Sequence, residues 1–182
     1  MNLLVLVHPH FNDIELVNTI ACLKKANMLT KLTYYNPNHI QATGQYEIVT
    51  INLENEVDFS KYDALFIPGG KGAQELRKDQ KSLAVIDKFI IDKKDIFAIC
   101  DAPNVLYENG YLDNFNYSSF PIPEIENKTV GKRNEDFVTC DGKFITAKCA
   151  AAGLELGLTI VKEKVGEEKY LEVKRAMYSR LD

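Results

Sequence analysis

The sequence contains no hydrophobic run of membrane-spanning length, no excess of basic residues and no cysteine pair of the C-x-x-C type. An α-helix that crosses a bilayer needs about 20 consecutive apolar residues, which excludes a membrane span here. The formal net charge of −4 at pH 7 gives no electrostatic reason to expect nucleic acid or an anionic membrane as a partner. Residues 1–7 also lack the basic region and the cleavage site of a secretory signal. We therefore expect a cytoplasmic protein.

The four cysteines are widely separated in the sequence: Cys22, Cys100, Cys140 and Cys149. Their spacing matches neither a zinc or redox pair nor the disulfide framework of a small secreted domain. We expect all four to be reduced thiols, of which one or two at most are reactive. Nothing in the sequence indicates a metal site or a cofactor.

The residues that are present are typical of one globular domain. The chain has 182 residues, 46% of them hydrophobic and 26% charged, and no repeat, low-complexity tract or linker divides it. Apolar strand patterns alternate with helical patterns, which predicts a mostly parallel sheet with helices on both faces. We therefore expect a single three-layer α/β/α domain over residues 1–182. The predicted strands are 3–7, 29–35, 63–67 and 96–99, and the predicted helices are 13–27, 82–91 and 101–107.

The remaining segments carry weaker patterns. Residues 112–128 are rich in turn signals, and helical patterns follow residue 150 and again Gly166. Two hairpins are predicted: a small, partly exposed one within 45–53, and one formed by 137–140 and 144–147 around the strong turn signal Asp141-Gly142.

The strongest chemical signal is Cys100, at the junction of a predicted strand and a predicted helix. Residues 96–99 are typical of a buried strand, and Asp101-Ala102-Pro103 is typical of the first turn of a helix. Ligands of open α/β sheets bind at the carboxyl ends of the strands. The same turn carries the nucleophile of many hydrolases, beside backbone N–H groups that form an oxyanion hole. The alternative is an inert cysteine of the core.

Three segments resemble motifs of the ThiJ/PfpI superfamily in their order and spacing. They are Phe11-Asn12-Asp13-Ile14-Glu15-Leu16, Asp63-Ala64-Leu65-Phe66-Ile67-Pro68-Gly69-Gly70 and Ala98-Ile99-Cys100-Asp101-Ala102-Pro103. The resemblance covers nearly the whole chain and is greatest to the small single-domain branch known as DJ-one, or protein deglycase. It implies a flavodoxin-like fold, similar to that of class I glutamine amidotransferases.

The resemblance also implies roles for four residues. Cys100 matches the family's nucleophile or redox cysteine, and Glu15 matches the carboxylic acid that hydrogen-bonds to that thiol. Gly70 and Asp101 match positions whose backbone N–H groups would hold an oxyanion. Members are similar to hydrolases or glyoxalases for small carbonyl compounds such as methylglyoxal, or look like stress-response proteins whose cysteine oxidises to a sulfinic acid. They are commonly dimers, which implies a homodimer here.

Glu15 and the glycine turn after Pro68 each have a structural alternative. With Asn12 as the N-cap, Glu15 would be the N3 residue of a capping box and would accept from the N–H of the cap. In the family role, Glu15 would be a buried, neutral acid that shares one proton with Cys100. The turn Gly69-Gly70-Lys71-Gly72 lacks the G-K-[ST] ending of a phosphate-binding loop. It therefore either presents an N–H group to the cysteine or is a simple turn.

The chain departs from the family pattern at the family's histidine, which is replaced by Phe120. All the histidines, His8, His10 and His39, precede Cys100. A Cys-His pair of the usual peptidase kind, with its histidine downstream, is therefore excluded, and we expect no peptidase activity. His10 follows the first strand, so it would either act as a general base within about 3 Å of the thiol or lie at the surface.

Asp101 and Cys149 are the other residues that set this chain apart. At roughly 6 Å and an effective dielectric of about 20, the Asp101 charge would cost a thiolate about 2 to 3 kcal/mol, unless the side chain caps its helix instead. Cys149 stands where the family has a glycine. It would either resolve an oxidised Cys100 as a disulfide or pack as a small buried residue. Cys22 and Cys140 are interpreted as packing residues.

Two hypotheses for the function follow. The first is a redox-responsive stress-protection protein whose partner is an oxidant and whose Cys100 becomes a sulfinate. The alternative is a cofactor-independent enzyme of the glyoxalase or deglycase type that acts on a small carbonyl substrate, with Cys100 as the nucleophile and Glu15 as the proton shuttle. The loss of the family's histidine favours the first hypothesis.

Overall fold

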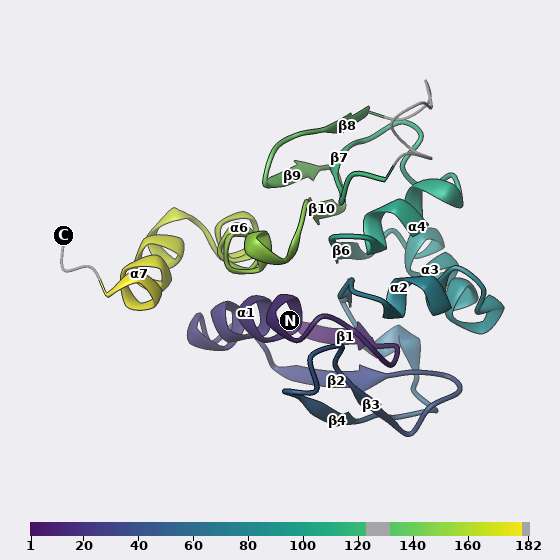
Figure 1. Ribbon diagram of the computed structural model, residues 1–182. Coiled ribbons are helices and arrows are strands. Elements are labelled where there is room, and N and C mark those ends of the chain that lie inside the picture. Colours follow the sequence, from purple (N-terminus) through teal and green to yellow (C-terminus); the bar gives the residue numbers. More distant parts are fainter. Residues whose placement is uncertain (123–131, 180–182) are drawn as a thin grey trace.

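The computed structural model describes residues 1–122 and 132–179. Its centre is a six-stranded sheet, in which every neighbouring pair is parallel except the antiparallel pair at one edge (Figure 1). From edge to edge the strands are β2 (Lys31–Tyr35), β1 (Asn2–Leu6), β5 (Ala64–Ile67), β6 (Asp95–Ile99), β10 (Phe144–Ala147) and β9 (Val138–Asp141).

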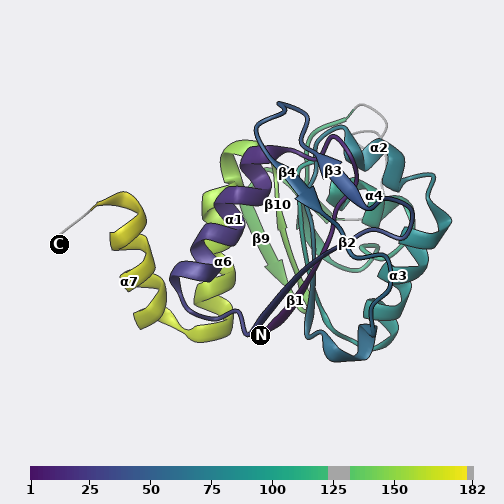
Figure 2. The same cartoon turned by 90° about the horizontal axis from the view of Figure 1, so that it is seen from below.

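Helices cover both faces of this sheet, as Figure 2 shows with the sheet seen nearly edge-on. One face carries α1 (Asp13–Lys25) and α6 (Gly153–Val165), with α7 (Glu167–Tyr178) packed outside them. The other face carries α2 (Gly72–Leu76), α3 (Gln80–Ile91) and α4 (Ala102–Glu108). The predicted three-layer α/β/α architecture is therefore confirmed.

The strands are apolar throughout because both of their faces are buried. In β1, Leu3 and Val5 belong to the core on the α1 and α6 side, and Leu4 and Leu6 belong to the core on the opposite side. Each is at most 1% exposed. Burying one such side chain contributes about 1.5 to 3 kcal/mol, so these continuous runs supply the main driving force for the layered fold.

The hairpin predicted within residues 45–53 is shifted along the chain. The structure pairs β3 (Gln41–Thr43) with β4 (Thr50–Asn52), so residues 45–49 form the turn. The carboxylate of Asp13 fixes this turn by accepting from the N–H groups of Tyr46, Ile48 and Val49 at 2.9 to 3.1 Å. A contact so distant in the sequence leaves no local signal, which explains the displacement.

The other predicted hairpin is confirmed, because β9 and β10 pair across Asp141-Gly142. The segment predicted as turn-rich, 112–128, contains a short strand, β7 (Asn116–Ser118), which pairs with β8 (Lys132–Asn134). Its residues 123–128 lie outside the described residues. A short 3₁₀ helix, η1 (Phe59–Lys61), was not expected from the sequence, and neither was α2. The start of the helix predicted from residue 150 is a 3₁₀ turn, η2 (Ala150–Ala152).

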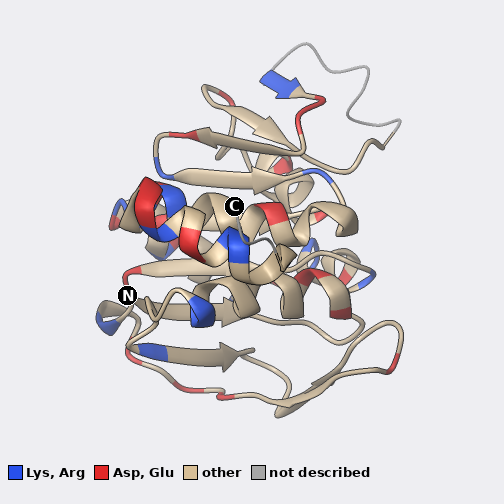
Figure 3. Cartoon of the chain, turned by 90° about the vertical axis from the view of Figure 1, so that its left-hand side faces the viewer, with Lys and Arg blue, Asp and Glu red and all other residues tan. Residues whose placement is uncertain are grey.

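Figure 3 looks onto the side that carries α7, where acidic and basic residues are interspersed. The first turn of α7 is acidic, with Glu167 and Glu168, and its last turn contains Arg175. This arrangement complements the helix dipole. Among the described residues, every helix falls short of the length and apolar character that a bilayer span needs.

Candidate active site

Cys100 lies in a strained turn directly after β6. Its φ of 63° is in the left-handed region, which is uncommon for a residue with a side chain. The turn is held on both sides, because the Cys100 N–H donates to the Ala147 carbonyl and the Phe120 N–H donates to the Cys100 carbonyl, both at 2.8 Å. Strain of this kind persists where the surroundings dictate it, and here it turns the thiol out of the strand.

Two glycines bring the loop after β5 close to that thiol. A Cβ on Gly69 would lie 2.6 Å from the Ile99 carbonyl oxygen and 2.8 Å from the Cys100 Cβ, so only glycine fits. Gly70 has a φ of 84°, again a conformation that favours glycine. The backbone N–H groups of Gly70 and Asp101 lie near the Cys100 sulfur and lower the pKa of its thiol. The glycine turn therefore presents an N–H group to the cysteine.

Glu15 lies in the first turn of α1, and its carboxyl group points to this same loop. Asn12 is the N-cap as predicted, and its side chain accepts from the N–H groups of Ile14 and Glu15 at 3.1 and 3.3 Å. The alternative of a capping box is wrong, however, because the Asn12 N–H donates to the Gly69 carbonyl and not to Glu15. The Glu15 carboxyl instead accepts from the Gly69 N–H at 2.8 Å.

The Glu15 carboxyl is fully buried and only partly satisfied. Its Oε1 has no hydrogen bond of normal geometry with any described residue, and the thiol of Cys100 interacts with the same carboxyl group. Burial raises the pKa of Glu15 to about 7, although the hydrogen bonds from Gly69 and Cys100 oppose the shift. Glu15 is therefore poised between its neutral and charged forms near neutral pH.

The ionisation of the Cys100 thiol depends on whether Glu15 carries its proton. Burial raises its pKa, and so does the Glu15 carboxylate, whereas the N–H groups of Gly70 and Asp101 lower it. Once Glu15 is neutral, its repulsion of a thiolate disappears and its O–H becomes a donor to sulfur. The two groups are therefore one coupled acid pair, and a thiolate at Cys100 goes with a protonated Glu15.

Asp101 is paired with an arginine that was not expected near the site. Arg77 Nη1 and Nη2 donate to its two carboxylate oxygens at 2.6 and 2.7 Å, and the side chains of Gln74 and Asn104 each donate at 2.9 Å. Although burial opposes its ionisation, these bonds hold the pKa of Asp101 below its usual range. Its side chain makes no helix cap, so that alternative is wrong. The Arg77 charge largely cancels the expected repulsion of a Cys100 thiolate.

These groups open into a cavity of about 530 Å³ at the carboxyl ends of the strands. Cys100, Glu15 and Cys149 all line it, and Tyr46, Phe120 and Ile122 give it apolar walls. The cavity lies at the sheet edge where open α/β folds bind ligands.

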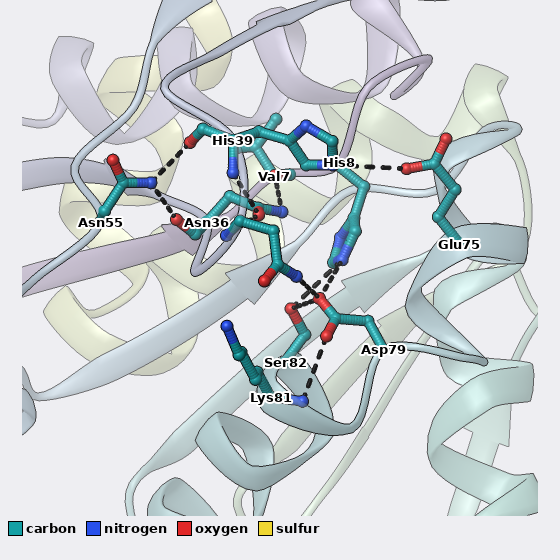
Figure 4. Close-up of polar contacts among 10 residues, drawn as sticks. Val7, His8, Asn36, His39, Asn55, Glu75, Asp79, Lys81 and Ser82 are labelled. Atoms are coloured by element: carbon teal, nitrogen blue, oxygen red, sulfur yellow. Dashed lines mark hydrogen bonds and ion pairs between the residues drawn. The ribbon is translucent and has the colours of Figure 1, made fainter.

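The structure keeps the histidines out of this cavity. His10 is exposed and does not line it, so the structure does not place it as a general base for Cys100. His8 is buried in a separate polar cluster with Asp79 and Ser82, and His39 is half-exposed, 3.9 Å from Glu75 (Figure 4). Among the described residues, no three His, Cys, Asp or Glu side chains gather as metal ligands would.

All four cysteines are free thiols, and their surroundings differ. Cys22 is buried between α1 and α6, as a packing residue should be. Cys140 is exposed, so its interpretation as a packing residue is wrong. The reason is that β9 is an edge strand, in which Thr139 turns inward and the next residue turns outward. Cys100 and Cys149 are both half-buried and share the cavity.

Sequence and structure comparisons show which proteins this chain resembles. The model of the DJ-1/PfpI family matches residues 1–163. The chain belongs to the DJ-1/PfpI family. It is 36% identical over 165 residues to uncharacterized protein MG029 of Mycoplasma genitalium, covering 87% of this chain and 86% of that protein. It is 26% identical to deglycase TK1284 of Thermococcus kodakarensis, covering 81% and 90%.

Solved structures of the family share the fold. The crystal structure of Drosophila melanogaster DJ-1beta matches with a TM-score of 0.82 at 24% identity and covers 98% of each chain. This likeness confirms the flavodoxin-like arrangement of a mostly parallel sheet between helices. The resemblance of the sequence motifs to this family is confirmed as well.

Proposed function

We propose that this protein is a cofactor-independent enzyme of the deglycase or glyoxalase type that acts on small aldehydes through Cys100. The observation that carries the proposal is the convergence of Cys100, the half-satisfied Glu15 carboxyl and two N–H donors, those of Gly70 and Asp101, at one cavity. A relative that covers most of this chain is named a deglycase. Of the two hypotheses, this one uses the proton of Glu15 in the chemistry itself, since the residue would act as both acid and base.

The first step would be addition of the Cys100 thiolate to the aldehyde carbon. The N–H groups of Gly70 and Asp101, which now face the sulfur, would stabilise the oxyanion that forms. Neutral Glu15 would give its proton to that oxyanion and leave a hemithioacetal beside a carboxylate. Because the pKa of Glu15 is about 7, the residue can act first as an acid and then as a base.

For a 2-oxoaldehyde, the Glu15 carboxylate would then move one proton from the aldehyde carbon to the neighbouring carbonyl carbon, while the hydroxyl proton of the hemithioacetal passes to the oxygen of that carbonyl. The product of that transfer is a thioester on Cys100, and water would hydrolyse it to a 2-hydroxy acid and the free thiol. No histidine is needed, which agrees with the absence of histidine from the lining of the cavity in the described residues. The apolar walls would hold an alkyl or aryl group of the substrate.

The test is conversion of methylglyoxal to lactate by the purified protein. We expect turnover by the wild type, loss of turnover in Cys100→Ser and full retention in Cys140→Ser, whose exposed thiol lies outside the cavity. Wild-type activity no higher than that of a heat-treated sample would overturn the proposal.

A second candidate, a redox-responsive stress-protection protein, is favoured by the half-exposed thiol of a cavity without a histidine base among its lining residues. Hydrogen peroxide would add two oxygens to Cys100, and the same N–H groups with neutral Glu15 would hold the sulfinate. Mass spectrometry after mild peroxide treatment should then find two added oxygens at Cys100 before any other site. Oxidation spread over all four thiols would count against this candidate.

We also propose that the protein is a cytoplasmic homodimer. The location is supported by four unpaired cysteines, which are typical of reducing compartments. The dimer is supported by apolar side chains exposed on one side of α1 and the adjacent turn: Ile14 at 44%, Val17 at 47% and Ile48 at 73%. Sedimentation equilibrium should give twice the chain mass for the wild type and the monomer mass for Val17→Glu.

A further inference from the structure

Cys149 lies one residue beyond the position opposite Cys100 in the sheet. β6 and β10 are parallel neighbours with Ala147 opposite Ile99, and the Cys100 N–H continues the ladder by donating to the Ala147 carbonyl. The Lys148 N–H donates to the Phe137 carbonyl at 3.0 Å, and the chain then bends at Lys148 and Cys149 before η2.

A backbone contact brings the two cysteines near each other. The Cys100 N–H donates to the Ala147 carbonyl at 2.8 Å, and Cys149 is only two residues beyond Ala147. The Cα atoms of disulfides are usually about 4.4 to 6.8 Å apart, a separation that two residues of chain can span from this contact.

Two further observations place the side chains on the same side of the sheet. Both pack against the apolar core beneath α1 and α6, and both line the same cavity. Cys149 has extended backbone angles, φ −159° and ψ 174°, and small alanines follow it in η2. Neither of the other thiols competes, because Cys22 is buried between helices and Cys140 is exposed on the edge strand.

We propose that Cys100 and Cys149 form a reversible disulfide through which the protein reduces small hydroperoxides. This inference rests on the nucleophilic Cys100 of the proposed function and adds a second class of substrate to the same cavity. Cys149 is a resolving residue, and it takes no part in the chemistry proposed for aldehydes.

The reaction balances in three steps. The Cys100 sulfur attacks the outer oxygen of the hydroperoxide, the O–O bond breaks, and the alcohol, or water from hydrogen peroxide, leaves with the thiol proton. Cys100 is now a sulfenic acid. The Cys149 sulfur then attacks the Cys100 sulfur, the S–O bond breaks, and hydroxide leaves as water with the Cys149 proton. An external dithiol reduces the disulfide by two exchanges and itself becomes a disulfide.

The donors around Cys100 suit both sulfur steps. The N–H groups of Gly70 and Asp101 favour a thiolate at Cys100, so they can stabilise this sulfur as the leaving group when the dithiol attacks Cys149. The half-buried sulfenic acid would meet Cys149 within the cavity before a second hydroperoxide arrives. Cys149 would thereby protect Cys100 from oxidation to the sulfinate.

The test is brief treatment of the full chain with hydrogen peroxide, followed by alkylation of free thiols in denaturant and peptide mass spectrometry. We expect peptides joined through Cys100 and Cys149 in the wild type and in Cys140→Ser, and their disappearance after addition of dithiothreitol. In Cys149→Ser, whose side chain is nearly isosteric, Cys100 should instead carry two added oxygens.

The outcomes separate this inference from the function on which it rests. Detection of a sulfinate at Cys100 together with an alkylated Cys149 in the wild type would overturn the disulfide. The same result would still support a reactive Cys100. An unmodified Cys100 beside intact methylglyoxal turnover would overturn hydroperoxide reduction alone. If Cys149→Ser is misfolded by near-ultraviolet circular dichroism, Cys149→Ala provides the same comparison, and the joined peptides of the wild type decide the matter without any variant.

Discussion

Two buried titratable side chains, His8 and Glu15, lie near the same edge of the sheet in different surroundings. His8 Nε2 lies 3.3 Å from Asp79 Oδ2 and 3.2 Å from Ser82 Oγ, and the Ser82 hydroxyl donates to that aspartate at 2.7 Å (Figure 4). Glu15, in contrast, keeps one oxygen without a normal hydrogen bond in the described structure and faces the cavity.

This difference indicates that His8 stabilises the fold, whereas Glu15 is available for proton transfer. The His8 cluster links the loop after β1 to the start of α3, and His8 Nε2, the Asp79 carboxylate and the Ser82 hydroxyl all have partners within it. A buried group that lacks a full set of partners is costly, and such groups persist where function requires them. The predictions below test that distinction through the effect of each change on aldehyde turnover, and the largest effect comes first.

Replacement of Cys100 by serine should have the largest effect. We expect kcat/KM for methylglyoxal to fall by roughly 10³-fold or more, because a serine hydroxyl is a far weaker nucleophile and Glu15 cannot fully deprotonate it. Lactate formation followed over time measures the loss. Retention of more than a few per cent of the wild-type rate would show that the chemistry lies elsewhere.

Replacement of Glu15 by glutamine should come next. The amide can still accept from the Gly69 N–H but cannot move a proton, so turnover should fall by about 10²-fold or more. Substrate dissociation should change little, so the loss should appear in kcat. A fall confined to KM would assign Glu15 a binding role instead.

The same variant should change the pH dependence of stability. The pKa of Glu15 rises from 4.5 when unfolded to about 7 when folded, so its stabilising contribution is complete below about 4.5 and is lost as the pH rises through about 7. The loss amounts to about 3 kcal/mol in the wild type. Urea unfolding at pH 5 and pH 8 should show it, and Glu15→Gln should lack it. Equal pH slopes for the two proteins would contradict the shift.

Replacement of Arg77 by glutamine should reduce turnover less, by about tenfold at neutral pH, because the Asp101 charge would then oppose a thiolate at Cys100. The rate at which iodoacetamide alkylates Cys100 should fall in parallel. The matched control is the double variant Arg77→Gln with Asp101→Asn, which keeps the backbone N–H and removes the charge. If the double variant fails to recover the alkylation rate, the charge argument is wrong.

Replacement of His8 by leucine should leave turnover nearly unchanged and reduce stability by about 1 to 3 kcal/mol, because Asp79 and Ser82 lose a buried partner. Burial lowers the pKa of His8, although the Asp79 hydrogen bond opposes this. Its stabilising contribution is therefore present above its unfolded value of 6.5 and is lost as the pH falls through the folded pKa, opposite in sign to Glu15. A large drop in kcat for His8→Leu would show that His8, like Glu15, takes part in turnover.

Several features of the site were predictable because their signals are local. The apolar run 96–99 followed by Pro103 predicted the strand and helix around Cys100, and Asn12 was confirmed as the cap of α1. The proposed role of Glu15 came from the family resemblance, since its position alone favoured a capping box. The partners of Asp101 had no local signal, because Arg77 follows the short, glycine-initiated α2, which was not predicted.

The sequence by itself determined the order of strands and helices and the residue types at the turns, because periodicity and turn chemistry act over a few neighbouring residues. Only the tertiary structure decided that Glu15 is buried beside a thiol, that the Asp101 carboxylate is paired with Arg77 and that Cys149 shares a cavity with Cys100. Burial and strand register depend on residues far apart in the chain. These long-range contacts, and no local pattern, set the proton affinity and the available partners of Cys100.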